Sequence, residues 1–220
     1  MDDTNAVEVA GVPTSALNRV DLSSSDIRQS VSLLKQACLD SGFFYEVFVQ
    51  SRRFFGLPLG EKMKLLRNEK HRGYAPLFDE VLDAANQIQG DYKEGYYIGT
   101  EVPEDDPDAQ KPHFGPNLWP SEEILPRWRQ TMEIFHSQAL NVVKVVARII
   151  ALALDLEADF FDKPEILGKP IPILRLLHYE GLISDPSKGI YGAGAHSDFG
   201  FITLLATDDV PVLQVRNVHL

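Results

Sequence analysis

Apolar side chains recur at helical spacing over a long stretch in the second half of the chain. Between residues 122 and 154 they follow one another every three or four positions, which places them on one face of a helix. Ser121 precedes the stretch as a capping residue. We therefore predict a long helix that packs against a core. Its apolar face consists of Leu125, Trp128, Met132, Phe135, Ala139, Val142, Val146, Ile149 and Ala153.

Two further helices are predicted nearer the N-terminus. Residues 23–41 carry an apolar stripe at helical spacing, and Gly42 follows them as a helix-ending signal. Residues 50–67 form a second helical stretch, which Pro58 and Gly60 must break or redirect. The first part of the chain is therefore expected to be mainly helical.

The pattern changes to that of strands after residue 170. Over residues 171–179 side chains alternate between two faces, so that Arg175 and Tyr179 share one face and His178 lies on the other. The segment 201–205 is apolar and partly β-branched, which is typical of a buried strand. Strands are thus predicted to follow the long helix.

A proline-rich stretch separates the early helices from the long helix. Five prolines and several acidic residues fall between residues 101 and 120, a composition typical of a loop or linker. We place a boundary there, between an N-terminal cap region, residues 1–115, and a core region, residues 116–220. The core region holds the long helix and the first core strands.

Composition narrows the class of protein. With 44% hydrophobic residues, the 220-residue chain can bury a core. The formal net charge of −11 argues against nucleic acid or an anionic membrane as a partner, because phosphate binding needs clustered lysine and arginine. The single cysteine, Cys38, excludes an intramolecular disulfide and fits a reducing compartment. Since the N-terminus lacks a signal pattern and the apolar stretch 145–156 is short and charged, we expect a soluble, cytoplasmic protein without a membrane span.

His196 and Asp198 are the strongest candidates for chemistry. They stand two positions apart, so on extended backbone their side chains point the same way. An imidazole and a carboxylate that converge supply two of the three ligands of the 2-His-1-carboxylate triad that holds non-haem Fe(II). Two such ligands at about 2.1 Å from one ion place their donor atoms about 3 Å apart. Taken alone, the pattern also fits a polar turn before a strand.

Other catalytic patterns are absent from the sequence. Ser197 lacks the flanking glycines of a nucleophile elbow, and no His-Glu-x-x-His zinc motif occurs. Gly192 and Gly194 lack the third glycine and the following helix of a dinucleotide site. Metal binding by His196 and Asp198 is therefore the one catalytic chemistry that these motifs favour.

The run GAHSDFGFITLL, residues 194–205, resembles the iron-binding segment of the 2-oxoglutarate and Fe(II)-dependent dioxygenases. The similarity is greatest to the plant and fungal branch related to isopenicillin N synthase, and it extends in order over nearly the whole chain. The other segments that carry it are residues 41–45, 53–58, 61–62, 73–74, 91–95 and 175–179.

The resemblance implies an α+β fold, with an N-terminal helical cap and a double-stranded β-helix (jelly-roll) core that is incomplete in this chain. It implies an oxidoreductase that uses Fe(II), 2-oxoglutarate and O₂ to oxidise a small molecule, with ascorbate as an assay additive. His196 and Asp198 would bind the metal, and Tyr179 would hydrogen-bond 2-oxoglutarate. The alternative for Tyr179 is an aromatic core residue with its hydroxyl at the rim. Glu94 would lie near the substrate entrance or, alternatively, form a surface salt bridge.

The chain departs from the family pattern in two places. Relatives follow the strand at residues 42–45 with an Asn-His-Gly-Ile turn, whereas here Tyr45 runs directly into Glu46. The second ligand histidine and the Arg-x-Ser pair of the family would lie beyond Leu220. His219 is a poor third ligand, since holding a penultimate side chain in place costs conformational entropy. We therefore expect impaired turnover; the alternative function is a catalytically inactive truncated isoform that acts as a binding partner or is an unstable by-product.

Overall fold

A three-stranded antiparallel sheet lies at the centre of the computed structural model, which describes residues 42–166, 168–181, 184–208 and 210. Its strands, in spatial order, are β1 (Gly73–Ala75), β2 (Glu94–Gly99) and β3 (Ile173–His178). β2 and β3 pair without interruption, from Glu94 opposite His178 to Gly99 opposite Ile173. The strand predicted at residues 171–179 is thus confirmed over Ile173–His178, where its alternation is unbroken by a bulge.

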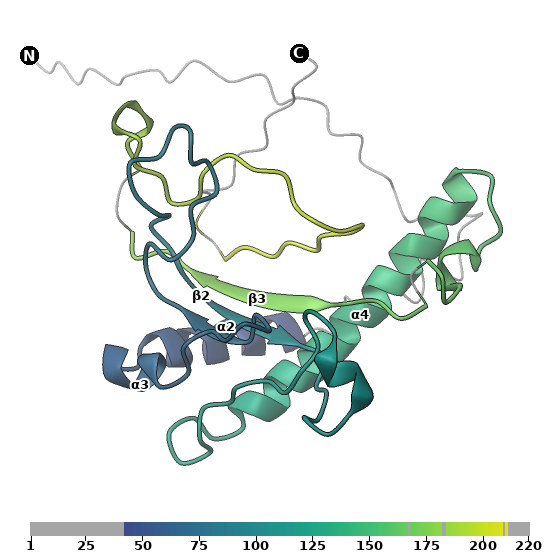
Figure 1. Ribbon diagram of the computed structural model, residues 1–220, viewed down its shortest axis with the longest axis horizontal. Helices are drawn as coiled ribbons and strands as arrows, with labels where there is room; N and C mark the ends of the chain where they lie inside the picture. Colours follow the sequence, from purple (N-terminus) through teal and green to yellow (C-terminus); the bar gives the residue numbers. More distant parts are fainter. Residues whose placement is uncertain (1–41, 167, 182–183, 209, 211–220) are drawn as a thin grey trace, which may run out of the picture.

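Two long helices cover one face of this sheet, and extended loops lie over the other face (Figure 1). The α-helices are α2 (Gly42–Phe55), α3 (Leu59–Met63) and α4 (Trp128–Ala153). The short 3₁₀ helices are η2 (Pro107–Gln110), η3 (Phe160–Asp162) and η4 (Pro186–Lys188). This layering separates a packed side of the sheet from a more open side that faces the loops.

The core forms between the helices and the even-numbered side chains of the strands. Phe54 of α2 and Trp128 of α4 are fully buried, and their ring centroids lie 5.5 Å apart. The ring of Tyr96, from β2, contacts both at 4.5 and 5.1 Å in edge-to-face arrangements, which aromatic rings favour. Ile98 and Leu176 pack into the same cluster. The odd-numbered side chains of β2 and β3 therefore point away from the helices, toward the loops.

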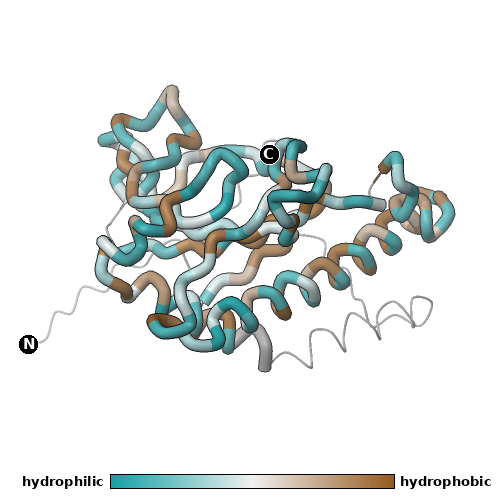
Figure 2. The backbone as a smooth tube through the Cα atoms, turned by 60° about the horizontal axis from the view of Figure 1, so that its bottom comes forward, coloured by the Kyte–Doolittle hydropathy of each residue, from teal (hydrophilic) through white to brown (hydrophobic). Residues whose placement is uncertain are grey.

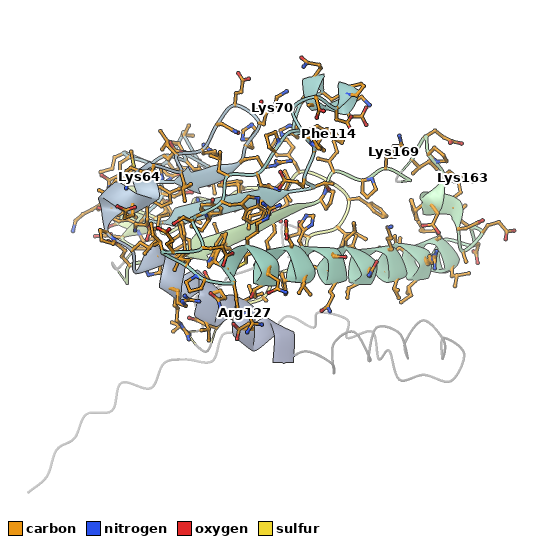
Figure 3. All side chains as sticks on the ribbon, turned by 90° about the horizontal axis from the view of Figure 1, so that it is seen from below. Lys64, Lys70, Phe114, Arg127, Lys163 and Lys169 are labelled. Atoms are coloured by element: carbon orange, nitrogen blue, oxygen red, sulfur yellow. The ribbon has the colours of Figure 1, made fainter. Side chains whose placement is uncertain are left out.

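α4 confirms the predicted long helix but begins later than expected. The segment before it forms turns, in which the Ile124 and Leu125 amides donate to the Ser121 carbonyl. Pro126 disfavours helical backbone in the residue before it and has no N–H to donate. Arg127 then takes a left-handed conformation (φ 64°) immediately before the helix, at the position labelled in Figure 3.

The apolar stripe of α4 is buried as predicted only in its first half. Trp128 and Met132 are fully buried, whereas further along the buried positions are Ala147 and Ala151 and the predicted Ala153 is exposed. Figure 2 shows apolar and polar positions alternating along this helix. By length and composition α4 could cross a membrane, a test that core helices also pass. Trp128 and Met132 at its start pack into the core, whereas little of the rest of the helix is buried.

The N-terminal helices differ from the prediction. α2 begins at Gly42, so Gly42 does not end a helix and residues 42–45 do not form the strand expected from the resemblance. Val47, Gln50 and Phe54 are buried at spacings of three and four, so one helical face continues through the place where relatives turn. The helix ends at Phe55, and α3 follows after the break predicted at Pro58.

The segment 201–205, predicted to be a buried strand, has no strand structure in the described part of the chain. Phe201, Leu204 and Leu205 are exposed. A strand is stable only when its backbone groups pair with a neighbour, and the described residues place none beside this segment. The apolar pattern was therefore not sufficient to form the strand.

The linker at residues 101–120 is irregular apart from η2, in agreement with the sequence. The sheet takes β1 and β2 from the predicted cap region, residues 1–115, and β3 from the predicted core region, residues 116–220. The two regions thus share one sheet, and the division between them stays a prediction. The expectations for residues 23–41, Cys38 and His219 lie outside the described residues.

Candidate metal centre

The loop that carries His196 packs against the loop that precedes β2, on the open side of the sheet (Figure 1). Three hydrogen bonds join residues 88–92 to residues 189–194. They run from the Ile88 amide to the Gly189 carbonyl (3.2 Å), from the Tyr92 amide to the Tyr191 carbonyl (2.9 Å) and from the Gly194 amide to the Asp91 carboxylate (3.0 Å). These bonds fix the backbone on the approach to His196.

His196 and Asp198 converge as their spacing suggested, although the backbone that carries them is a loop and not a strand. The distance from His196 Nε2 to Asp198 Oδ1 is 3.4 Å. His196 Nδ1 lies 2.8 Å from the Gly194 carbonyl oxygen. Because a carbonyl only accepts, this bond requires a proton on Nδ1. Nε2 is the ring nitrogen that faces the carboxylate.

An imidazole nitrogen and a carboxylate oxygen at this distance fit two ligands of one shared cation. Adjacent ligands of one ion stand about 3 Å apart, and a metal-binding imidazole commonly donates its other N–H to a carbonyl or carboxylate. Both side chains are accessible, with exposed fractions of 37% for His196 and 53% for Asp198. Within the described ranges no group of three or more histidine, cysteine, aspartate or glutamate residues is placed to hold a metal. The described residues thus supply two ligands of a triad, and their metal-binding role stays a prediction.

Tyr179 lies just past the end of β3, beside the same loop. It is 41% exposed, so it is only partly buried. An added Cβ on Gly192 would come within 3.4 Å of the Tyr179 ring, so ring and loop are in contact. Partial burial, followed by the nearby Asp91 charge, raises the pKa of the Tyr179 hydroxyl above its usual value. Its contact with 2-oxoglutarate stays a prediction.

His178 lies on the opposite face of β3, as the alternation predicted. Its Nδ1 is 2.8 Å from a Glu94 carboxylate oxygen, and its ring stacks on Phe55 of α2 at a centroid distance of 5.2 Å. It therefore belongs to the helix-covered side of the sheet and not to the side of His196.

Glu94 is the centre of a buried polar cluster, which the sequence did not suggest. Its side chain is 2% exposed, so it is not a surface salt-bridge partner. One carboxylate oxygen accepts from Lys62 at 2.7 Å and from the Tyr74 hydroxyl at 2.5 Å, and the other faces His178. Burial alone would raise the pKa of Glu94, but these hydrogen bonds bring that pKa below its usual value.

A second charged network, also missed from the sequence, lies on the open side of the sheet. Lys93 is in contact with Asp91 and lies 3.1 Å from Glu80. Glu80 also accepts from Arg175 at 2.7 Å and from the Tyr97 hydroxyl. Burial opposes ionisation of Glu80, but the Tyr97 hydrogen bond and the Arg175 and Lys93 charges lower its pKa.

Both clusters could have been recognised from the way side chains alternate between the two faces of the sheet along β2 and the residues before it. Asp91, Lys93 and Tyr97 are odd-numbered and lie on the open side, whereas Glu94 and Tyr96 are even-numbered and face the helices. Because a strand beginning at residue 94 was not predicted, the two sets of charges could not be separated from sequence alone.

Gly194 gives a direct test of how tightly the loop is packed. A Cβ there would collide with the Gln87 side chain and lie 2.9 Å from the Asp83 nitrogen, so we expect Gly194→Ala to lower the free energy of unfolding by about 1–3 kcal/mol. Gly60→Ala is the matched control. Nothing lies within 4 Å of its added Cβ, and in α3 the change should be neutral or slightly stabilising. Urea unfolding of both variants measures the difference; equal effects would show that the loop is loosely packed.

The comparisons with known proteins identify the family of the chain. Residues 12–122 match the family described as non-haem dioxygenase in morphine synthesis N-terminal. The chain belongs to the 2-oxoglutarate and Fe(II)-dependent dioxygenase family, as the resemblance implied.

The curated relatives include two plant enzymes. The chain is 44% identical to kihadalactone A synthase LFS from Citrus sinensis, over 98% of this chain and 68% of the relative. It is 43% identical to azadirone synthase LFS from Melia azedarach, over 90% of this chain and 64% of the relative. The chain therefore spans about two thirds of the length of these relatives.

Solved structures show the same fold. A 2OG-Fe(II) oxygenase family protein from Caulobacter crescentus aligns with a TM-score of 0.54 and 27% identity, over 64% of this chain and 44% of that protein. A full-length protein from Neurospora crassa, solved in complex with alpha-KG, aligns with a TM-score of 0.50 and 33% identity, over 63% and 41% of the two chains. The predicted α+β fold with part of a jelly-roll core is thereby confirmed.

Proposed function

We propose that the chain contributes the metal-binding half of an Fe(II)- and 2-oxoglutarate-dependent oxidoreductase. The observation that carries this proposal is the pair of His196 Nε2 and Asp198 Oδ1, 3.4 Å apart, with the imidazole oriented by the Gly194 carbonyl. The Neurospora crassa protein, which has a similar fold, is described in complex with alpha-KG, and a 35% identical relative from Emericella nidulans is named a 2-oxoglutarate-Fe(II) type oxidoreductase. These names support Fe(II) as cofactor and 2-oxoglutarate as co-substrate.

Each residue of the centre has a separate task in this proposal. His196 and Asp198 hold the metal through a neutral imidazole nitrogen and a carboxylate oxygen. Tyr179 donates its hydroxyl hydrogen bond to 2-oxoglutarate, because a phenol hydroxyl is protonated at neutral pH and can donate. When bound, Fe(II) and 2-oxoglutarate supply an O₂-dependent oxidation of the substrate, in which 2-oxoglutarate becomes succinate and carbon dioxide.

The substrate proposed is a small molecule of the kind handled by the plant relatives named kihadalactone A synthase and azadirone synthase. The formal charge of −11 supports a protein that acts without nucleic acid or an anionic membrane as partner. The single cysteine, Cys38, fits a location in the reducing cytoplasm. O₂ is the remaining partner of the reaction.

Succinate formation tests the proposal. The purified chain, supplied with Fe(II), ascorbate, O₂ and 2-oxoglutarate, is expected to form succinate above the level of a chain in which both His196 and Asp198 are replaced by alanine. A rate equal to that of the double variant, together with no binding of Co(II) as an Fe(II) substitute, would contradict the proposed centre.

A second candidate function is that of a catalytically inactive protein-binding partner. Apolar side chains exposed in the loop beside the site favour it, with Phe199 fully exposed and Leu205 59% exposed. The two candidates give different results in the same experiment. An inactive partner binds Co(II) weakly or not at all and forms no succinate. The enzyme binds Co(II) and forms succinate.

A further inference from the structure

The carboxylate of Asp91 lies between the sheet and the backbone that carries His196, and the proposed chemistry gives it no task. The residue is 0% exposed. Its Oδ1 accepts a hydrogen bond from the Gly194 amide at 3.0 Å and from the Gln87 side-chain amide at 2.7 Å, and its Oδ2 contacts the Lys93 ammonium. A buried carboxylate is costly unless donors surround it, so these three groups are held in fixed places around it.

Gly194 connects this carboxylate to the imidazole. Its N–H donates to Asp91, and its carbonyl accepts from His196 Nδ1 at 2.8 Å. The Gln87 side chain and the Asp83 backbone nitrogen leave no room for a Cβ at Gly194. The residue is therefore fixed by a hydrogen bond on one side and by close packing on the other, which fixes the direction of its carbonyl.

We propose that Asp91 is a positioning residue for metal binding. It holds Gly194, and the Gly194 carbonyl in turn keeps the His196 ring in the Nδ1–H tautomer, with Nε2 free for the metal. Such indirect partners of a metal-binding histidine set both its tautomer and its orientation. Lys93 compensates the buried charge of Asp91 through a charge-assisted contact. The inference rests on the proposed function in one respect, which is that His196 is a metal ligand.

The sheet provides a matched control for an Asp91 variant. Glu94 is also a buried carboxylate that pairs with one lysine, but its hydrogen bonds go to Lys62, Tyr74 and His178 on the helix-covered side. Asp91→Ala and Glu94→Ala therefore remove the same kind of buried charge pair, and only the first touches the loop of His196. Loss of stability alone would affect both variants.

The decisive measurement is the tautomer of His196, read from the ¹⁵N NMR shifts of its ring nitrogens in the metal-free protein. The signal is assigned by its disappearance in His196→Gln. We expect the Nδ1–H form in the unmodified chain and in Glu94→Ala, and a shift toward the Nε2–H form in Asp91→Ala. An unchanged tautomer in Asp91→Ala would overturn the proposal.

Co(II) affinity gives a second readout. We expect Asp91→Ala to bind Co(II) about 10-fold more weakly than Glu94→Ala. This is the lower end of the loss of metal affinity seen when a residue that orients a metal ligand is replaced. If the alanine variants do not fold, Asp91→Asn and Glu94→Gln replace them. The amide of Asp91→Asn has only one oxygen, which cannot accept from both Lys93 and the Gly194 amide. If His196 has the same tautomer in these two variants, the proposal is overturned. If the unmodified chain binds no Co(II), the proposed metal centre fails, while the tautomer still decides the role of Asp91.

Discussion

Replacing His196 by glutamine is expected to weaken Co(II) binding by about 100-fold, or to abolish it. The imidazole Nε2 is one of two donors that face each other 3.4 Å apart, and the amide of glutamine binds transition metals poorly. Loss of a direct ligand should lower metal affinity at least as much as loss of a residue that orients a ligand, which lowers it roughly 10- to 100-fold. Titration of the absorption bands of Co(II) measures the dissociation constant.

His136→Gln is the matched control for this change. His136 lies in α4, its Nε2 is 3.2 Å from the Pro172 carbonyl, and burial lowers the pKa of its ring. It belongs to the helix-covered side, so its replacement should leave the Co(II) affinity unchanged. Equal losses in both variants would mean that Co(II) binds elsewhere or that the loss comes from unfolding.

The sequence predicted the parts of the fold that depend on a single element. The apolar stripe that contains Trp128 and Met132 was enough to predict α4, and the alternation from Arg175 to Tyr179 was enough to predict β3, because both patterns follow from the geometry of one helix or one strand. The position of Pro126 moved the start of α4, which is a local effect that the sequence does contain.

The parts that depend on a partner were predicted less well. Residues 201–205 have the composition of a strand, but a strand needs a neighbour to pair with, and composition cannot supply it. The start of α2 at Gly42 was missed because the family pattern favoured a strand there, whereas Val47, Gln50 and Phe54 continue a helical face. Long-range packing decided both cases.

In the candidate site, too, features of neighbouring residues were predicted and contacts between distant segments were not. The convergence of His196 and Asp198 was predicted from their spacing on a strand, and the structure brings the two side chains together on a loop. Asp91 lies 103 positions before Gly194, so their hydrogen bond could not be inferred without the arrangement of the two loops. The candidate ligand pair could be found from the sequence, whereas the residues that hold its loop in place could not.

The two charged networks also divide the sheet into two functional sides. Lys62 and Glu94 connect α3 to β2 and β3 on the helix side, where their partner Tyr74 belongs to the hydrophobic core. Asp91 and Lys93 connect β2 to the His196 loop on the open side. Charge changes on the first side should act on folding, and charge changes on the second side should act on metal binding as well.

Replacing Glu94 by glutamine is accordingly expected to lower the free energy of unfolding at pH 7 by about 3 kcal/mol. The change removes one partner of an ion pair whose side chains are 8% and 2% exposed, and it leaves the Lys62 ammonium buried without its counter-charge. Glu61→Gln is the control, because Glu61 pairs with Lys64 on the exposed surface of α3 and such pairs contribute less than about 1 kcal/mol. Urea unfolding measures both.

The pH dependence separates this electrostatic effect from a packing defect. The pKa of Glu94 is lower in the folded protein than its usual value of 4.5, so the folded state gains stability from the carboxylate above that pH. This contribution is lost as the pH falls through the lower folded pKa, where the carboxyl becomes protonated and resembles the glutamine amide in charge. The difference between Glu94→Gln and the unmodified chain should therefore be largest near pH 7 and shrink steadily below pH 4.5. A difference that stays constant down to pH 3 would show that the loss comes from altered packing around Tyr74 and His178 and not from the buried charge.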